Sequence, residues 1–199
     1  MKKLWFLILV PLLIFSILLV GCEEGDTGLP PPDSGNGEIT ETDSVPLAEL
    51  GLSRDNPLPM GEWLLTPEGI KVTMVNLIEG NQAWGIIQEA NMFNDPPGEG
   101  MHYVIVTVKV KNISSEDEPC LVSDIDFELI GSSNKVFHCY DRSVVLPDEG
   151  SLSELWIELY HGGEEIGSLH FYTPEDETNL VLIWASGFRS ENKRFFEVR

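Results

Sequence analysis

Residues 103–111 read Tyr-Val-Ile-Val-Thr-Val-Lys-Val-Lys. Every second residue of this stretch is valine, and the residues between the valines change from tyrosine and isoleucine through threonine to lysine. Strict alternation with β-branched side chains is typical of a strand that turns one face to the core. The stretch therefore predicts a β-strand whose second face grades from apolar to charged.

Shorter segments with the same period lie on both sides of this strand. Two of them, residues 126–130 and 135–139, flank Gly131-Ser132-Ser133-Asn134 and predict a hairpin. The other alternating segments are residues 70–74, 152–159, 169–171, 180–184 and 195–198. Short strands separated by turn residues at this spacing predict an all-β fold, an immunoglobulin-like antiparallel β-sandwich.

Residues 81–93 depart from the alternation. Their apolar residues recur near helical spacing, and Asn81 is of a residue type that caps helices. The segment predicts one short helix or irregular crossover, ended by the turn residues Asn94-Asp95-Pro96-Pro97-Gly98.

The amino-terminal residues have the pattern of an export signal. Two lysines follow Met1, and residues 4–20 are apolar apart from Pro11 and Ser16. A membrane-spanning helix is the alternative, but the run is at the short limit for spanning a bilayer. It ends in Leu19-Val20-Gly21-Cys22, which resembles the lipobox of bacterial lipoproteins. The match implies that residues 1–21 are a signal peptide and that fatty acyl chains on Cys22 anchor the mature chain.

Residues 22–55 have the composition of a disordered acidic tether. From Cys22 to Ser53 there are eight acidic residues and no Lys or Arg, and Pro30-Pro31-Pro32 lies among them. Such a stretch buries too little apolar surface to offset the entropy of ordering, and its like charges favour an extended chain. We therefore expect the folded domain to occupy residues 56–199.

The charge of the chain limits its partners. Its 12 Lys and Arg residues face 33 Asp and Glu residues, for a formal net charge of −21. This field repels phosphate backbones and anionic lipid headgroups, so we expect no nucleic-acid partner and no membrane docking through a basic patch. Solubility of an exported protein is the simpler explanation of the charge.

Three segments, taken in order, resemble a known family. They are residues 69–73, residues 103–112, and Gly162-Gly163 followed by residues 167–171 and 180–182. The chain resembles the immunoglobulin-like domains of unknown function of bacterial lipoproteins, grouped with a mycobacterial secreted immunogenic antigen. Residues 56–61 and 90–94, with Tyr103, look like one sub-branch. Some members carry the label of a telomeric repeat-binding factor, which the charge here contradicts. The resemblance implies a sandwich outside the cell and supplies no catalytic residues.

Two cysteines, Cys120 and Cys139, remain when Cys22 is acylated. An even pair in an exported domain, on either side of a hairpin, predicts a disulfide. Two buried thiols are the alternative, because disulfide geometry is exacting. A hairpin centred between residues 132 and 133 places Cys139 opposite Asp126, so the bridge requires a strand bend or a neighbouring strand.

No motif for metal binding stands out. The histidines, His102, His138, His161 and His170, lack the HExxH spacing, and there is no Cys-x-x-Cys. Asp124 and Asp126, with residues 116–118 nearby, lack the spaced oxygen ligands of a calcium loop. We therefore expect no metal site.

Signals for catalysis and cofactor binding are equally weak. There is no G-x-S-x-G elbow and no Gly-rich phosphate loop after a strand. Of the tryptophans beyond the leader, Trp63, Trp84, Trp156 and Trp184, some can form a sugar-stacking platform, but core packing is the simpler role for most. We expect no catalytic residue and no cofactor.

Together these features favour a lipoprotein of the bacterial cell envelope, held on the extracytoplasmic face of a membrane by its lipid anchor. Its immunoglobulin-like domain is then a binding or interaction module rather than an enzyme, with proteins or other envelope components as partners. The alternative is an accessory protein that handles a metal or delivers a small ligand, and His102 and His138 are the residues on which metal titration tests it.

Overall fold

The computed structural model describes residues 49–147, 157–185 and 192–199. The predicted signal peptide, Cys22, most of the predicted tether and Trp156 lie outside the described residues. The described elements are β1 (Leu64–Leu65), β2 (Ile70–Glu79), α1 (Gly80–Ala90), β3 (Met101–Asn112), β4 (Cys120–Val122), η2 (Asp124–Asp126), β5 (Phe127–Ile130), β6 (Val136–His138), η3 (Cys139–Asp141), β7 (Ile157–Leu159), β8 (Glu164–Pro174), β9 (Val181–Trp184) and β10 (Arg194–Glu197), where η marks a 3-10 helix.

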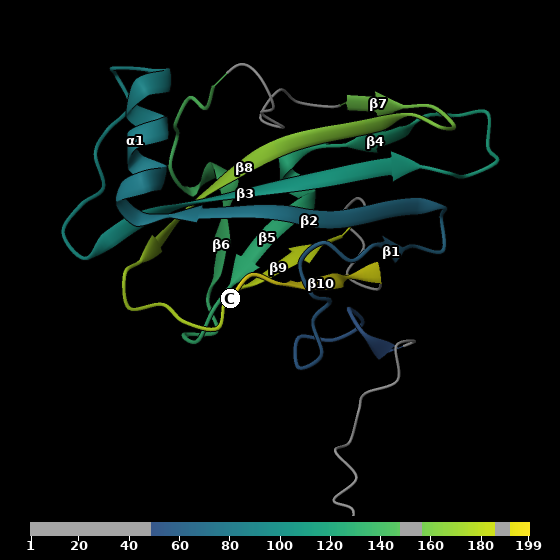
Figure 1. Ribbon diagram of the computed structural model, residues 1–199, viewed down its shortest axis with the longest axis horizontal. Coiled ribbons are helices and arrows are strands. Elements are labelled where there is room, and N and C mark those ends of the chain that lie inside the picture. The colour runs from purple at the N-terminus through teal and green to yellow at the C-terminus, as the bar shows by residue number, and fades with distance from the viewer. Residues whose placement is uncertain (1–48, 148–156, 186–191) are drawn as a thin grey trace, which may run out of the picture. The chain divides into compact units, whose positions relative to one another are not determined.

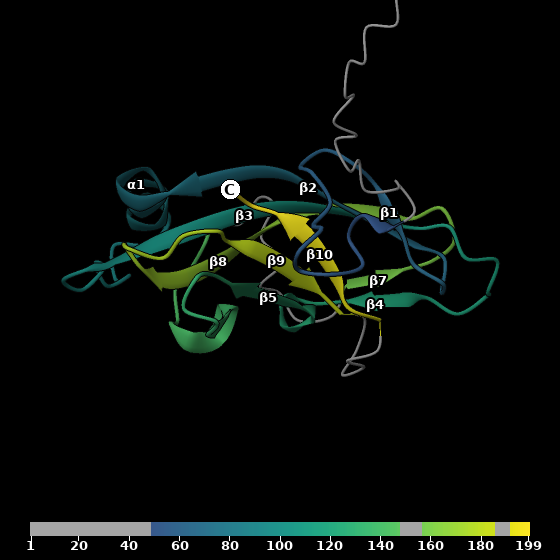
Figure 2. The same cartoon turned by 90° about the horizontal axis from the view of Figure 1, so that it is seen from below.

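Within the described residues, two four-stranded antiparallel sheets pack as a sandwich, which confirms the predicted fold class (Figures 1 and 2). The first sheet has the strand order β1-β2-β3-β8, and the second has the order β10-β9-β5-β6. The short strands β4 and β7 pair with each other, at the end of the sandwich away from α1 (Figure 1).

The valines of β3 form the centre of the core, as their alternation predicts. Val104, Val106, Val108 and Val110 are each at most 1% exposed, and they belong to one cluster with the side chains of the second sheet. Full burial of one such side chain stabilises a fold by about 1.5–3 kcal/mol. The predicted hairpin is also confirmed, because β5 pairs with β6.

A β-bulge at Val75 changes which face β2 presents. Met74 lies opposite Val108, but Asn76 lies opposite Thr107, so one extra residue is accommodated between them. Beyond the bulge, Ile78 lies opposite Ile105 on the outer face of the first sheet. Because of the bulge, the outer face of β2 carries the apolar Ile78 near α1, whereas it carries Lys71 at the other end of the strand.

Residues 80–90 form a helix, which confirms the helix predicted for residues 81–93 but ends three residues earlier, at Ala90. Ala83 and Ile87 of α1 are fully buried and pack against Tyr103 and Ile105, on the outer face of the first sheet. The predicted cap was wrong: Glu79 occupies the N-cap position and makes no side-chain capping bond. The helix starts directly at the end of β2, so the last strand residue takes the place expected for Asn81.

The first described residues are bonded to the last strand. The Phe195 amide donates to the Gly51 carbonyl at 2.9 Å, and the Leu58 amide donates to the Phe195 carbonyl at 2.8 Å. The Glu197 amide donates to the Leu58 carbonyl at 2.8 Å. Ordered contacts thus begin before residue 56.

Candidate functional site

The two cysteines of the domain are free thiols in the structure, so the predicted disulfide is not formed in it. Cys120 lies in β4, opposite Leu159 of β7, whereas Cys139 lies in η3 after β6 of the second sheet. The two residues therefore belong to elements that do not pair with each other. Burial raises the pKa of the Cys120 thiol to about 11 and raises the pKa of the Cys139 thiol further.

The four histidines are dispersed. His102 is buried with its Nε2 3.1 Å from the Thr173 hydroxyl, and the Nε2 of buried His170 is 2.8 Å from the Arg142 carbonyl oxygen. Desolvation lowers the pKa of both imidazoles. His138 stacks on Tyr140, with ring centroids 4.6 Å apart. Among the described residues, no three or more His, Cys, Asp or Glu side chains are grouped so as to hold a metal ion.

The aspartates considered for calcium are used inside the fold. The Ser123 amide donates to Asp126 Oδ2 at 2.9 Å, and the Ser123 hydroxyl donates to Asp124 Oδ1 at 3.0 Å. These contacts form the start of η2. The Asp126 carboxylate therefore caps this turn, and the Asp124 carboxylate accepts from the side chain of the capping serine.

The tryptophans divide between core and surface. Trp184 is 1% exposed in the sandwich core, as the core-packing prediction requires. Trp84 of α1 stacks on Tyr103 with ring centroids 6.0 Å apart. Trp63, just before β1, is 37% exposed beside the outer face of the first sheet.

Two adjacent apolar side chains project from the turn after α1. Met92 is 82% exposed and Phe93 is 85% exposed. They lie in residues 91–95, here called the Met-Phe loop. Single exposed apolar residues are ordinary on a protein surface, but an adjacent pair exposed to this degree marks a candidate contact site.

Hydrogen bonds fix the Met-Phe loop. The Phe93 amide donates to Asn91 Oδ1 at 2.9 Å. Asn94 Nδ2 donates to the carbonyls of Ile87 at 2.6 Å and Val145 at 2.8 Å, and Asn94 Oδ1 accepts from the Val145 amide at 2.8 Å. A single side chain thus joins the helix end, the loop and a segment 51 residues further along the chain.

A layer of aromatic rings supports the loop from below. The buried Tyr103 hydroxyl donates to the Asp95 carbonyl at 2.9 Å, and the rings of Tyr103 and Tyr172 are 5.2 Å apart. Arg142 pairs with the Asp95 carboxylate at 2.9 Å and lies 5.7 Å from the Tyr172 ring. These contacts attach the loop to the sheet through Tyr103, Tyr172 and Arg142.

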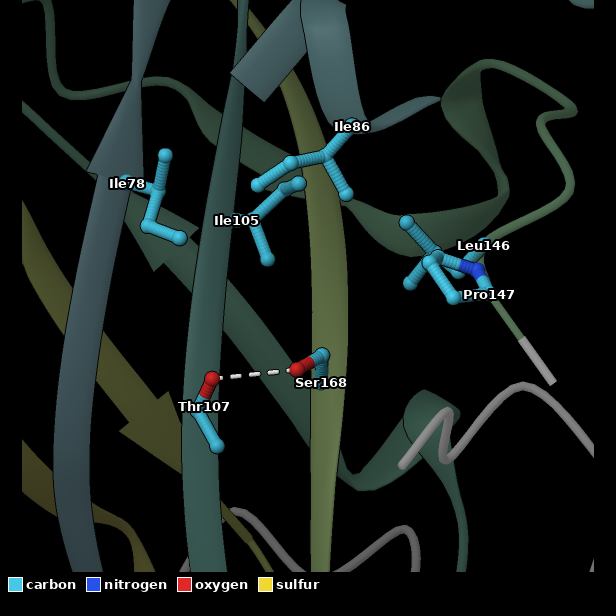
Figure 3. A pocket seen from close by; sticks show the side chains of 7 residues that line it. All are labelled: Ile78, Ile86, Ile105, Thr107, Leu146, Pro147 and Ser168. Atoms are coloured by element: carbon cyan, nitrogen blue, oxygen red, sulfur yellow. Dashed lines mark hydrogen bonds between the residues drawn. The ribbon is translucent and has the colours of Figure 1, made fainter. Parts of the chain in front are cut away.

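A small apolar pocket opens on the same face of the first sheet (Figure 3). Its volume is about 90 Å³. Figure 3 shows apolar side chains along its length and the hydroxyls of Thr107 and Ser168, 3.0 Å apart, at one end. The lining residues are Ile78, Ile86, Ile105, Thr107, Leu146, Pro147 and Ser168. The pocket can accept a short apolar group.

Neither feature was predicted from the sequence. The sequence assigns residues 90–93 to the end of a predicted helix and Asn94 to the turn after it, and residues 90–94 also resemble one sub-branch of a family. The pocket joins residues of β2, α1, β3, β8 and the segment before residue 148, and no local pattern signals that combination.

In the residues that the structure describes, the fold and these surface features define a small antiparallel β-sandwich with one α-helix and an exposed apolar loop. The chain belongs to the family described as Domain of unknown function (DUF4352), which matches residues 70–194. No curated protein matches the sequence.

Several solved structures are similar in fold. The yjhA protein of Bacillus subtilis has 13% sequence identity and a TM-score of 0.49, over 71% of this chain and 99% of that one. A proposed lipoprotein of Bacillus subtilis, ycdA, has 14% identity and a TM-score of 0.48, over 67% of this chain and 37% of that one. An uncharacterised β-sandwich protein of Clostridium difficile has 11% identity and a TM-score of 0.40, over 71% and 94% of the two chains.

Within the part of the chain that the structure describes, no helix has the length and apolar character needed to cross a bilayer.

Proposed function

We propose that this protein is a non-enzymatic binding module on the extracytoplasmic side of a bacterial membrane, anchored through acyl chains on Cys22. The lipobox-like Leu19-Val20-Gly21-Cys22 and the acidic composition of residues 22–48 support the anchor and tether. The domain binds a second envelope protein through the Met-Phe loop.

The exposure of Met92 and Phe93 on a hydrogen-bonded loop is the observation that carries this proposal. Burying one such side chain in a partner gains about 1.5–3 kcal/mol. Hydrogen bonds from Asn94 and to Asn91 already hold the loop. Binding therefore requires little further ordering of the loop, and the entropy cost that weakens the binding of flexible segments is small. A central apolar anchor on a rigid support is typical of interface hot spots.

The charge of the chain selects the kind of partner. At −21 the protein is repelled by anionic lipid surfaces and by acidic proteins. The partner therefore offers an apolar pocket on a neutral or basic surface, and contact between Phe93 and lipid is the competing possibility.

A photo-crosslinking amino acid placed at position 93 tests the proposal in native membranes. Tyr140 provides the matched control, because it is also an exposed aromatic residue, 64% exposed, and lies in η3 rather than in the loop. We expect one discrete protein adduct from position 93 and none from position 140. The purified partner should then bind the wild-type chain, and Phe93→Ala should weaken binding about tenfold or more.

Asn94→Ala separates presentation of the loop from contact with the partner. It keeps Phe93 but removes the bonds to Ile87 and Val145, so it should also weaken binding, while Phe93→Ala leaves the loop ordered. Adducts formed only with lipid, adducts equally strong from position 140, or unchanged affinity of Phe93→Ala would each overturn the proposal.

A further inference from the structure

The outer face of β3 and β8 changes character along its length. Paired residues on this face are, in order from the helix end, Ile105 with His170, Thr107 with Ser168, Lys109 with Ile166, and Lys111 with Glu164. Successive pairs are about 7 Å apart along the strands. The apolar pocket, which includes Ile105, therefore leads to two hydroxyls and then to two lysines.

A third lysine joins them from β2. Lys71 lies directly opposite Lys111, and the Nζ atoms of Lys71 and Lys109 are 5.4 Å and 5.8 Å from the centroid of the Trp63 ring. Glu164 accepts from Lys109 at 2.7 Å and is 3.6 Å from Lys111. Of the three lysines, here called the lysine group, Lys109 and Lys111 therefore share the Glu164 carboxylate, and Lys71 lies against the Trp63 ring.

This concentration of positive charge is unusual in so acidic a chain. Within the described residues, Lys71 has the Trp63 ring as its neighbour and forms no ion pair with a carboxylate. Like charges directly opposite each other destabilise a sheet. Lysines often protect edge strands, but Lys71, Lys109 and Lys111 lie on β2 and β3, which are the inner strands of this sheet.

We infer that this face binds a small amphipathic carboxylate, with its apolar chain in the pocket and its carboxylate at Lys109 and Lys71. The hydroxyls of Thr107 and Ser168 lie between the two ends, within reach of the ligand's polar end. Trp63, 37% exposed, and Ile166, 49% exposed, give the head-group region apolar sides. This inference does not depend on the Met-Phe loop.

The size of the pocket and the charge around it both limit which ligands can bind. A pocket of about 90 Å³ holds on the order of six water molecules, and so a short alkyl chain but not a long acyl chain. Lys109 is about 7 Å along the strand from Thr107, at the polar end of the pocket, so a carboxylate of roughly hexanoate length held by the lysine reaches into that end of the pocket. A single negative charge balances the unpaired Lys71, whereas a dianionic phosphate meets more repulsion from the surrounding acidic surface.

Calorimetric titration of the full chain with three probes separates the two halves of the site. Hexanoate carries both the chain and the charge, hexanol carries the chain alone, and acetate carries the charge alone. We expect hexanoate to bind about tenfold tighter than either of the others, a difference of about 1.4 kcal/mol, because hexanoate alone occupies both halves of the site. Methyl NMR shifts should be confined to the isoleucines that line the pocket, Ile78, Ile86 and Ile105.

Two variants and a matched control test the assignment. Lys109→Gln should weaken hexanoate about fivefold or more and leave hexanol unchanged. Ser168→Leu fills one end of the pocket and should weaken the binding of hexanoate and of hexanol to the same degree. Acetate binding should stay unchanged, which shows that the head-group region is intact. Lys135→Gln, between β5 and β6 of the other sheet, should change nothing.

Hexanoate binding no tighter than hexanol or acetate would overturn the inference, as would unchanged affinity in Lys109→Gln or methyl shifts away from the pocket. Phe93→Ala distinguishes this site from the proposed protein contact. It should weaken partner binding about tenfold or more and leave hexanoate affinity within about twofold of wild type.

Discussion

Removal of the small Asn112 side chain should strongly reduce the free energy of unfolding. It is fully buried at the end of β3, and its Nδ2 donates to the Leu159 carbonyl at 2.7 Å. Its Oδ1 accepts from the Ser114 amide at 2.8 Å. One amide therefore ties the central strand of the first sheet to β7 and to the chain that follows β3.

Replacing Asn112 with Ala leaves a buried carbonyl and a partly buried amide without these partners. Each loss costs about 1–2 kcal/mol, so we expect the free energy of unfolding to fall by about 2–4 kcal/mol. At about 3 °C per kcal/mol for a domain of this size, Tm should fall by roughly 6–12 °C. Urea unfolding followed by tryptophan fluorescence measures the change, with an m-value equal to that of the wild type.

Asn76→Ala is the matched control, because Asn76 is an exposed asparagine on β2 of the same sheet. Its effect should stay within about 0.5 kcal/mol. Amide exchange adds a local measure, since Ser114 should lose protection in Asn112→Ala beyond the global change. The reasoning is refuted if Asn112→Ala costs less than about 1 kcal/mol, or no more than the control.

Three further predictions concern pH, thiols and the helix. Desolvation lowers the pKa of His102 and His170 in the fold, so the unfolded chain binds more protons. The free energy of unfolding should therefore fall as pH drops below about 6.5, the pKa of an unfolded histidine. A pH series of urea titrations measures this dependence, and His170→Gln should flatten it. Burial raises the pKa of both thiols, so iodoacetamide at neutral pH should modify Cys120 slowly and Cys139 only after unfolding, as read by intact mass; rapid modification of native Cys139 would contradict its placement. A Cβ at Gly85 of α1 meets no atom within 4 Å, so Gly85→Ala should stabilise the fold by about 0.5–1 kcal/mol, and a lower Tm would refute the helix geometry.

Patterns that depend on one strand alone were readable from the sequence. The alternating valines of residues 104–110 predict their burial because neighbouring side chains on a strand point to opposite faces, and the structure places all four in the core. The helix at residues 80–90 was likewise visible as a change of period. Its cap was missed because β2 runs into α1 without a loop.

Features that depend on tertiary contacts were not readable. The bulge at Val75 shifts the face of Ile78, yet valine is as good a strand residue as its neighbours, so the sequence carries no mark of the extra residue. The bond from Asn94 to Val145 joins positions 51 residues apart. Local periods assign residues 91–93 to the end of the predicted helix and residues 94–95 to the following turn, and neither assignment predicts an exposed loop held by hydrogen bonds.

The gradation along residues 103–111 lies between these two cases. Its change from apolar to charged was visible in the sequence, but its meaning was not, because α1 covers only one end of that face. The uncovered end, with Lys109 and Lys111, becomes part of a candidate ligand site only through its neighbours on β2 and β8.

The bonds between the first described residues and β10 have a mechanical consequence. Leu58 and Phe196 form a parallel bridge, flanked by the bonds that join Leu58 and Gly51 to β10. A pull on the amino-terminal side acts along the chain and across these bonds, so it loads them together rather than breaking them one at a time. The domain should therefore withstand tension on its amino-terminal side better than tension that peels β8 away from β3 at the edge of the first sheet.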